Sequence, residues 1–399
     1  MLNVSRHFAL SCLALTLAAA SAIVSLHGQA PSVKITDPTS VVMIVNRDSN
    51  DLAFLDMKTK KLVGSVFLGN NVNPHMVMMS PDGRYVVTGG TRANMAYIVD
   101  VRTLQLVKKI PVDIAPEHLS FSPDSRWYYQ GNPDGDSISV IDMQSLTKIK
   151  TIPGFAEPLN VTFLPDGSKA YVGNYGAHWV GVVDVRRHEL AKKIQVAAAP
   201  GVAKLDPDKY LGEIHGINIA ALSNDGKTLY AADGDFGVVA VIDPREDKVL
   251  KTIRVGKDPW RIYLSHDGKY AITPNNGDQT ISIIDLAAGK VAATLEAGEN
   301  MTGVNFAAGK AFVISSTTGF VYVYDMKSLR PAGRIKIGTN IQLETATTDT
   351  KDEKLYLADS TENAVVIIDA KTEAFEKVRN VGLYPWGTHV MDSKDNYCH

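Results

Sequence analysis

Cysteine is almost absent from this sequence: the 399 residues contain only Cys12 and Cys398. Cys12 falls in an apolar N-terminal stretch, so removal of that stretch would leave one cysteine and exclude an intramolecular disulfide. The motif C-x-x-C-H is missing, which excludes a c-type haem attached in the usual way. A P-loop, a G-x-S-x-G elbow and an H-E-x-x-H pair are missing as well, which removes three common signatures of catalysis.

The chain also has no large excess of positive or negative charge. The formal net charge is −2, which gives no electrostatic reason to expect nucleic acid or an acidic membrane surface as a partner. Hydrophobic residues make up 45% of the chain and charged residues 21%, a balance typical of a folded globular protein. A chain of 399 residues exceeds the usual length of one domain, unless the architecture is a repeat that grows by adding units.

The N-terminal residues have the pattern of a secretory signal. Arg6 precedes an apolar run over residues 8–26, and small residues follow around Ala22 and Ala30. We predict a signal peptide over residues 1–30, cleaved after one of these alanines, and a mature protein that is periplasmic or secreted without a membrane span. The alternative is an uncleaved anchor, because the apolar run is nearly long enough to cross a bilayer.

A repeat is the strongest signal in the chain. Its unit is an apolar strand ending in Ser-Pro-Asp-Gly, a short strand, a turn, a strand ending in Val-Ile-Asp and a basic strand. Successive units lie 40 to 44 residues apart, with one gap of 59 residues. Four short β segments in such a period predict an all-β chain that forms one eight-bladed β-propeller. The aspartate that closes the third strand occurs at Asp56, Asp100, Asp142, Asp184, Asp243, Asp285, Asp325 and Asp369.

The two ends of the chain complement each other. Residues 41–45 form a strand with no Ser-Pro-Asp-Gly strand before it, and residues 388–391 supply such a strand at the other end. We therefore predict that strands from both termini share one blade and leave no free sheet edge. The propeller is predicted to span residues 31–399, with an insertion near residues 197–214 over the channel mouth. A seven-bladed ring is the alternative, because one copy of the repeat is degenerate.

The repeat resembles that of the YVTN family of bacterial propellers. The hallmark of that family is visible in residues 228–233 and, more clearly, in Ala170-Tyr171-Val172-Gly173-Asn174. The resemblance covers essentially the whole chain after the N-terminal stretch and implies the propeller fold. It implies little about function, because one fold hosts many unrelated functions.

The polar residues of the innermost strands indicate where a site would lie. These strands line the central channel with alternate side chains pointing inward, and the face that points between blades is uniformly apolar. On the channel face, three strong polar groups are predicted at one height: His118, Arg261 and His389. Two more histidines, His75 and His215, directly precede the same strand and are predicted at the channel mouth. Asn160 is predicted at the same height as Arg261.

A single channel histidine most often only hydrogen-bonds water or a neighbouring blade. Several histidines converging on one mouth favour a functional site, because imidazole is the commonest metal ligand and clustered imidazoles are costly when all are charged. We therefore predict that a redox cofactor binds at this mouth. The predicted metal ligands are His118, His215 and His389.

An eight-bladed, exported propeller with axial histidines and an inward arginine resembles the haem d1 propellers, which occur in cytochrome cd1 nitrite reductase and in haem d1 assembly proteins. The resemblance implies that one of the three predicted metal ligands binds the iron of a haem d1-type tetrapyrrole. It also implies that Arg261 meets a tetrapyrrole carboxylate. Because the sequence shows no cytochrome c domain, the resemblance implies an accessory, carrier or maturation role beside a periplasmic redox partner protein. Whether the chain is itself an oxidoreductase stays open.

Three other functions fit the sequence. A copper site is one of them, because the soft thioethers of Met76, Met78 and Met391 are expected on the channel face. Another is a non-catalytic module that binds a partner protein or a small ligand at the channel mouth. A lactonase is the weakest, because it needs several carboxylates at the mouth and the sequence offers only Glu117, Glu213 and Glu344.

Overall fold

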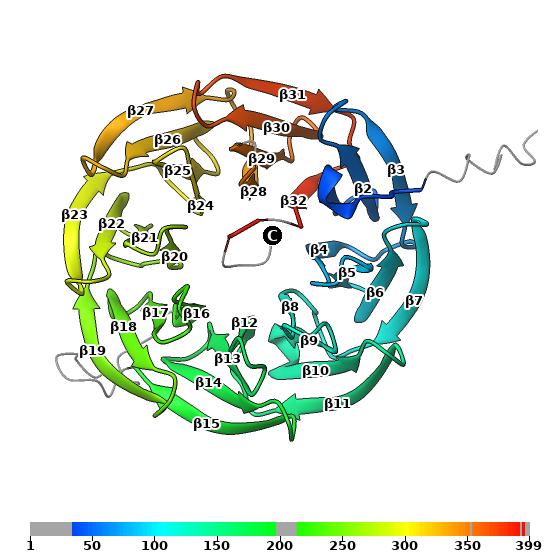
Figure 1. Ribbon diagram of the computed structural model, residues 1–399, viewed down its shortest axis with the longest axis horizontal. Helices are drawn as coiled ribbons and strands as arrows, with labels where there is room; N and C mark the ends of the chain where they lie inside the picture. The colour runs from blue at the N-terminus through cyan, green and yellow to red at the C-terminus, as the bar shows by residue number, and fades with distance from the viewer. Residues whose placement is uncertain (1–33, 197–213, 352, 392, 396–399) are drawn as a thin grey trace, which may run out of the picture.

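Eight four-stranded antiparallel sheets surround a central axis in the computed structural model (Figure 1), which describes residues 34–196, 214–351, 353–391 and 393–395. Each sheet is one blade, with its innermost strand at the axis and its outermost strand at the rim. The predicted all-β, eight-bladed propeller is confirmed, and the seven-bladed alternative is wrong for the part of the chain described. The predicted signal peptide, most of the predicted insertion and Cys398 lie outside the described residues.

The blades are numbered along the chain and their strands are given from the axis outward. Blades 1 to 4 comprise β32 (Pro385–His389), β1 (Val41–Asn46), β2 (Asp51–Asp56) and β3 (Leu62–Phe67); β4 (Pro74–Met79), β5 (Tyr85–Gly90), β6 (Met95–Asp100) and β7 (Gln105–Pro111); β8 (Leu119–Phe121), β9 (Trp127–Asn132), β10 (Ser137–Asp142) and β11 (Thr147–Pro153); and β12 (Pro158–Phe163), β13 (Lys169–Asn174), β14 (Trp179–Asp184) and β15 (Glu189–Gln195).

Blades 5 to 8 comprise β16 (Ile217–Leu222), β17 (Leu229–Asp233), β18 (Val238–Asp243) and β19 (Lys248–Arg254); β20 (Tyr263–Leu264), β21 (Tyr270–Asn275), β22 (Thr280–Asp285) and β23 (Lys290–Glu296); β24 (Met301–Ala307), β25 (Lys310–Ser315), β26 (Phe320–Asp325) and β27 (Arg330–Lys336); and β28 (Leu343–Asp349), β29 (Lys354–Asp359), β30 (Ala364–Asp369) and β31 (Phe375–Arg379). Two single-turn 3₁₀ helices are also described, η1 (Pro38–Ser40) and η2 (Pro133–Gly135). No helix in the described ranges has the length and apolar character that a membrane crossing requires.

The repeated aspartates each end the third strand of a blade, as predicted. Their carboxylates accept a hydrogen bond from a backbone N–H two or three residues further on, for example from Thr59 to Asp56 and from Arg187 to Asp184. Aspartate suits this position because its short side chain can accept a hydrogen bond from a backbone N–H of the turn that follows it. The repeat therefore recurs because each blade needs the same turn between its third and fourth strands.

The C-terminal strand closes the ring. β32 pairs with β1, so the end of the chain supplies the innermost strand of the blade that the N-terminal part begins (Figure 1). The predicted closure is confirmed, and the strand covers Pro385–His389 instead of residues 388–391. It packs on both sides, because it also contacts β28 and β4 of the flanking blades.

The register of β32 corrects one prediction. His389 lies opposite Met43, in the position that Thr162 occupies opposite Tyr171 in blade 4. His389 is therefore two residues, or about 7 Å along the strand, farther from the strand start than a counterpart of Asn160 would be. The prediction that His389 shares one height with His118 and Arg261 is wrong.

The error arises because the prediction used the wrong part of the repeat to align the inner strands. The prediction aligned the last copy on Asp395, as if it were the aspartate of a Ser-Pro-Asp-Gly turn. The inner strands are instead aligned by a proline at or just before their start, which follows a residue with positive φ in five blades. These prolines are Pro74, Pro116, Pro158, Pro259 and Pro385.

The YVTN hallmark has a physical role in blade 4. A Cβ on Gly173 would lie 2.4 Å from the Asn218 carbonyl oxygen of blade 5, so only glycine permits this approach. Asn174 ties the start of the hairpin together, because its Nδ2 donates to the Val172 carbonyl at 3.0 Å and its Oδ1 accepts from Ala156 N at 3.0 Å. The motif is thus a set of contacts that bring two blades together.

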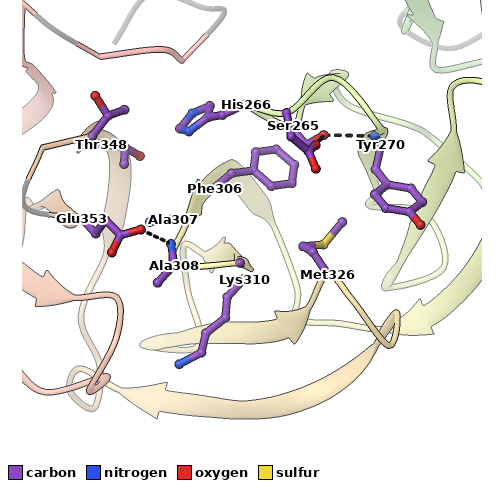
Figure 2. Close-up of a pocket in the computed structure, with 13 residues that line it drawn as sticks. Ser265, His266, Tyr270, Phe306, Ala307, Ala308, Lys310, Met326, Thr348 and Glu353 are labelled. Atoms are coloured by element: carbon purple, nitrogen blue, oxygen red, sulfur yellow. Dashed lines mark hydrogen bonds between the residues drawn. The ribbon is translucent and has the colours of Figure 1, made fainter.

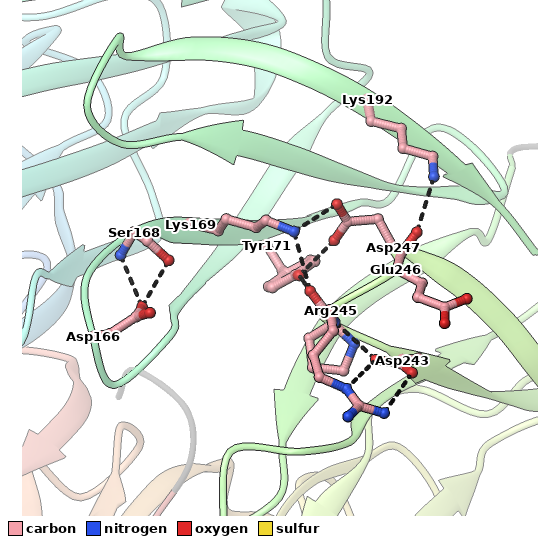
Figure 3. Close-up of polar contacts among 10 residues, drawn as sticks. Asp166, Ser168, Lys169, Tyr171, Lys192, Asp243, Arg245, Glu246 and Asp247 are labelled. Atoms are coloured by element: carbon pink, nitrogen blue, oxygen red, sulfur yellow. Dashed lines mark hydrogen bonds and ion pairs between the residues drawn. The ribbon is translucent and has the colours of Figure 1, made fainter.

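Tyr171 of the same motif binds the next blade (Figure 3). Its hydroxyl donates to the Pro244 carbonyl at 2.8 Å and lies 2.7 Å from an Asp247 carboxylate oxygen, both in the turn between β18 and β19. Lys169 reaches the other Asp247 oxygen at 2.7 Å. Polar side chains on the second strand of blade 4 therefore bind a turn of blade 5 across a boundary that is otherwise apolar.

Replacing Tyr171 by phenylalanine is expected to lower the free energy of unfolding by about 1–3 kcal/mol. The side chain is fully buried, so the variant leaves a carboxylate and a carbonyl without the hydroxyl they bind. Chemical denaturation followed by circular dichroism measures the change. An unfolding midpoint equal to that of the unaltered protein would contradict this role.

Candidate functional site

The channel has two different ends, because all inner strands run in the same direction. They start at one end, here termed the mouth, and finish at the turns that carry Ser-Pro-Asp-Gly at the other. Side chains from several blades meet near the mouth. We term them the axial cluster: Arg47, His75, Glu117, His118, Arg261, Glu344 and Trp386.

Three aromatic rings form one side of the cluster. The ring of His75 lies 5.0 Å from that of Trp386 and 6.2 Å from that of His118, measured between centroids. These residues come from blades 2, 1 and 3, so the ring closure and two successive inner strands bring them together. His118 is 3% exposed, which places its imidazole in the interior of the channel wall.

Two arginines of the cluster act on these rings, Arg47 by contact with Trp386 and Arg261 through its charge on both histidines. The Arg47 guanidinium lies 4.3 Å from the Trp386 ring centroid and donates to the Asn73 amide oxygen at 3.2 Å. Arg261 is 5% exposed, and its Nε donates to the Asn218 amide oxygen at 3.0 Å. Both guanidiniums are thus oriented by neutral partners, which leaves their positive charge uncompensated by these contacts.

Burial and the arginines keep both histidines neutral. Burial, together with Arg47 and Arg261, lowers the pKa of His75 to about 3. Burial, Arg261 and His75 likewise hold the pKa of His118 well below its ordinary value. The Nδ1 atom of His75 is buried and has no hydrogen-bond partner among the described residues. A neutral imidazole with an available nitrogen is the form that binds a metal ion.

Two carboxyl groups of the cluster titrate near neutral pH. Burial raises the pKa of Glu117 to about 7, Asp134 and Glu157 add to the rise, and Arg47 and Arg261 oppose it. Burial also raises the pKa of Glu344 to about 7, against the effect of the Ser360 hydroxyl, which donates to it at 3.1 Å. The cluster therefore gains negative charge as the pH rises through neutrality.

The variant Glu344→Gln tests this environment through stability. The pKa of Glu344 in the folded protein lies above its ordinary value of 4.5, so its contribution is fully present below pH 4.5 and is lost as the pH rises through about 7. Relative to Glu344→Gln, the unaltered protein is expected to lose about 3 kcal/mol of stability between these limits. Urea denaturation of both proteins at pH 5 and pH 8 measures the difference, and a difference that does not change with pH would contradict the assignment.

His215 belongs to an adjoining group of side chains on blades 4 to 6. Its ring stacks on Tyr175, with centroids 5.6 Å apart, and its Nδ1 lies 3.0 Å from an Asp258 carboxylate oxygen. Tyr175 also meets Trp260 edge to face at 5.7 Å, and Trp260 lies beside Arg261. The group therefore extends an aromatic surface away from the axial cluster.

Asn160 has on the inner strand of blade 4 the register position that His118 has in blade 3. Its Nδ2 donates to the Thr162 hydroxyl at 3.1 Å, and both residues line a cavity of 270 Å³ with Met78 and Asp395. Met76 has the same register position on β4 as Asn160 has on β12, and it is buried within the apolar core between blades 2 and 3.

The three predicted metal ligands do not form a common site. Within the described ranges, no group of three histidine, cysteine, aspartate or glutamate side chains is arranged to hold a metal ion. His389 is displaced along its strand, and His215 is engaged with Asp258. A centre with His118, His215 and His389 as joint ligands is therefore not present, whereas a group that needs one protein ligand is compatible with the cluster.

The predicted residues His75, His118 and Arg261 lie near one another, since Arg261 lowers the pKa of both histidines and His75 also lowers the pKa of His118. Sequence reasoning missed Arg47 and Trp386, and it placed Glu117 and Glu344 only in a weaker hypothesis. The sequence does carry a signal for residues of this region: the position after the proline at the start of an inner strand. It is occupied by His75, Glu117, Trp260 and Trp386.

The fold and the axial cluster define an eight-bladed β-propeller with a basic, aromatic site at one end of its channel. No family model and no curated protein matches the sequence. The solved structure of the dihydro-haem d1 dehydrogenase NirN in complex with DHE is similar, with a TM-score of 0.74 and 18% identity over 91% of this chain and 78% of that one. The hydrazine synthase of Kuenenia stuttgartiensis matches with a TM-score of 0.55 and 21% identity, over 78% of this chain and 97% of that one. At these identities the likeness shows the fold alone.

Proposed function

We propose that this protein is a periplasmic propeller that binds a carboxylate-bearing, haem d1-type tetrapyrrole at its channel mouth, as an accessory or maturation protein of a respiratory redox enzyme. The observation that carries the proposal is His75: its buried Nδ1 lacks a hydrogen-bond partner in the described part of the chain, and burial with Arg47 and Arg261 keeps its imidazole neutral. The similarity in fold to a haem d1 dehydrogenase supports it.

The residues of the axial cluster suit such a ligand in three ways. A neutral imidazole is a common axial ligand of haem iron, and His75 offers one. Guanidinium groups pair with carboxylates through two parallel hydrogen bonds, and the hydrogen bonds described above for Arg47 and Arg261 go to neutral amide oxygens. The flat rings of Trp386 and Trp260 offer apolar surface for a planar macrocycle.

Each residue then has a defined task. His75 is the proposed iron ligand, with His118 of the neighbouring blade as the second candidate. Arg47 and Arg261 hold the carboxylates, and burial of the cluster excludes water from the ligand. When bound, the tetrapyrrole would supply electron transfer and binding of small molecules at its iron. No specific observation favours the copper alternative.

Titration with an iron tetrapyrrole, followed by absorption spectroscopy, tests the proposal. We expect saturable binding by the unaltered protein and loss of the histidine-ligand spectrum in His75→Gly. Added imidazole is expected to restore that spectrum, because it can occupy the space of the missing ring. His118→Ala is expected to retain the spectrum, and the opposite pattern would assign the ligand to His118.

An unaltered protein that does not bind the tetrapyrrole would contradict the proposal. The non-catalytic module, which binds a protein or another small ligand at the same mouth, would then take its place. The variant Arg261→Gln distinguishes these outcomes further, since a ligand without carboxylates gains little from a guanidinium.

A further inference from the structure

One buried amide at the channel mouth has a donor group without an acceptor. Asn218 lies at the start of β16, the inner strand of blade 5, and is only 1% exposed. Its amide oxygen accepts a hydrogen bond from Arg261 Nε at 3.0 Å. Its Nδ2 is buried and has no hydrogen-bond partner among the described residues. Such unpaired groups are uncommon in folded proteins, and a ligand is one of the partners that can satisfy them.

The orientation of this amide follows from its partner. Turning the amide over would place two N–H groups, Asn218 Nδ2 and Arg261 Nε, against each other, so the oxygen faces the arginine. The backbone is held as well, because a Cβ on Gly173 would lie 2.4 Å from the Asn218 carbonyl oxygen. Asn218 therefore keeps an unused donor beside the arginine that it orients.

Arg261 supplies a positive charge next to this donor. Its guanidinium lies 5.4 Å from the Trp260 ring centroid, and the residue is 5% exposed. The charge acts on the axial cluster, because it lowers the pKa of both histidines and opposes the raised pKa of Glu117. A buried donor and a cation thus lie together at the mouth.

A groove lined by blades 6, 7 and 8 shows a different arrangement (Figure 2). It has a volume of 240 Å³, and Lys310 and Glu353 are among its charged side chains. Lys310 binds the Glu373 carboxylate at 2.7 Å, and Glu353 accepts a hydrogen bond from Ala308 N at 3.1 Å. These two charges are used within the protein, whereas the hydrogen bond described for Arg261 goes to a neutral amide.

The two donors define the kind of group that fits them. A carboxylate can accept from the amide N–H and from the guanidinium together, and its negative charge strengthens both bonds. A neutral carbonyl gains less, and a cation is repelled by the arginine. Glu117 competes less for Arg261 at neutral pH than an ordinary carboxylate, because burial raises its pKa to about 7.

We propose that Asn218 Nδ2 and the Arg261 guanidinium form a subsite that holds one carboxylate group of a ligand. The tetrapyrrole of the proposed function is one source of this group, and in that case the subsite rests on the proposed function. A free small carboxylate is the other source. Asn218 acts twice, since its oxygen orients the arginine and its nitrogen binds the carboxylate that the arginine holds.

Nuclear magnetic resonance of the Asn218 side-chain amide tests the proposal. In protein labelled with nitrogen-15, Asn218→Asp identifies the signal by its loss and keeps an acceptor for Arg261 Nε. We expect a downfield shift of the Nδ2–H signal with a zinc tetrapyrrole that carries free carboxylates. Its methyl ester has the same macrocycle and is expected to give a much smaller shift. Sodium acetate is the probe for a free carboxylate, and a shift with acetate assigns the subsite to that source.

The variant Asn73→Asp is the matched control for affinity. It also places a carboxylate beside an arginine of the mouth, because the Asn73 amide oxygen accepts from Arg47. Only Asn218→Asp removes the buried donor Nδ2 next to Arg261. We expect Asn218→Asp to weaken binding of the free-acid tetrapyrrole at least about tenfold more than the control does.

An amide signal that stays in place with acetate and with the free-acid tetrapyrrole would overturn the proposal, as would an equal shift with the ester. A buried water molecule would then be the partner of Nδ2. Absorption titration reports tetrapyrrole binding separately. A protein that binds the tetrapyrrole without moving this signal keeps the proposed function and loses the subsite, and a protein that responds only to acetate shows the reverse.

Discussion

Deletion of residues 385–399 is expected to abolish cooperative folding of the entire propeller. The deletion removes β32, so β1 loses its partner at the axis and blade 1 ends in an open edge. It also removes contacts to blades 8 and 2, where Thr388 and Val390 are buried. The loss of one whole strand exceeds the net stability of about 5–15 kcal/mol that a folded protein usually has.

Thermal denaturation followed by circular dichroism measures this effect. The matched control is a chain that lacks only residues 396–399, which retains every described strand and is expected to keep a cooperative transition. A chain without residues 385–399 that melts like the full-length protein would show that ring closure does not depend on β32.

The double variant Arg47→Gln and Arg261→Gln is expected to weaken tetrapyrrole binding by about a thousandfold. Each charge-assisted bond to a carboxylate contributes about 2 kcal/mol, and the two contributions are roughly additive when different carboxylates are held. The amide side chains keep hydrogen-bonding capacity, so the fold near Asn73 and Asn218 is expected to persist. Fluorescence or absorption titration gives the dissociation constant.

Arg187→Gln is the matched control for charge. Its side chain is 74% exposed next to Asp184, on the outer part of blade 4, and its loss is expected to leave affinity unchanged. Esterification of the tetrapyrrole carboxylates should reproduce the effect of the double variant in the unaltered protein. Equal affinities of the double variant and the control would contradict the roles of Arg47 and Arg261.

The architecture could be predicted from the sequence because each blade repeats the same local solution. The eight aspartates cap the same turn, and the apolar side of the inner strands is buried between blades, as Val77 and Leu119 show. Local requirements of this kind leave a periodic trace in the sequence. Ring closure was predictable for the same reason, because one blade lacked its first strand and the other end of the chain had a spare one.

The axial site was predictable only in part. Its position in the channel follows from the repeat, but the height of each side chain depends on the register of a single strand. A slip of two residues in β32 moved His389 away from His118 and brought Trp386 beside His75. Arg47 was missed because it lies in the connection between β1 and β2, where no repeat motif indicates a direction.

The charge states could not be predicted from the sequence. Burial among several blades lowers the pKa of His75 and raises that of Glu344, while Arg47 adds to the first shift and opposes the second. These effects arise between residues far apart in the chain.

The central claim is that the channel mouth holds a tetrapyrrole. The most direct test is the absorption spectrum, together with the iron content, of the protein purified from its native host. We predict a tetrapyrrole spectrum with a histidine ligand and iron in proportion to the protein, and loss of the histidine-ligand spectrum in His75→Gly. A colourless, iron-free protein that also fails to take up added iron tetrapyrrole would contradict the claim.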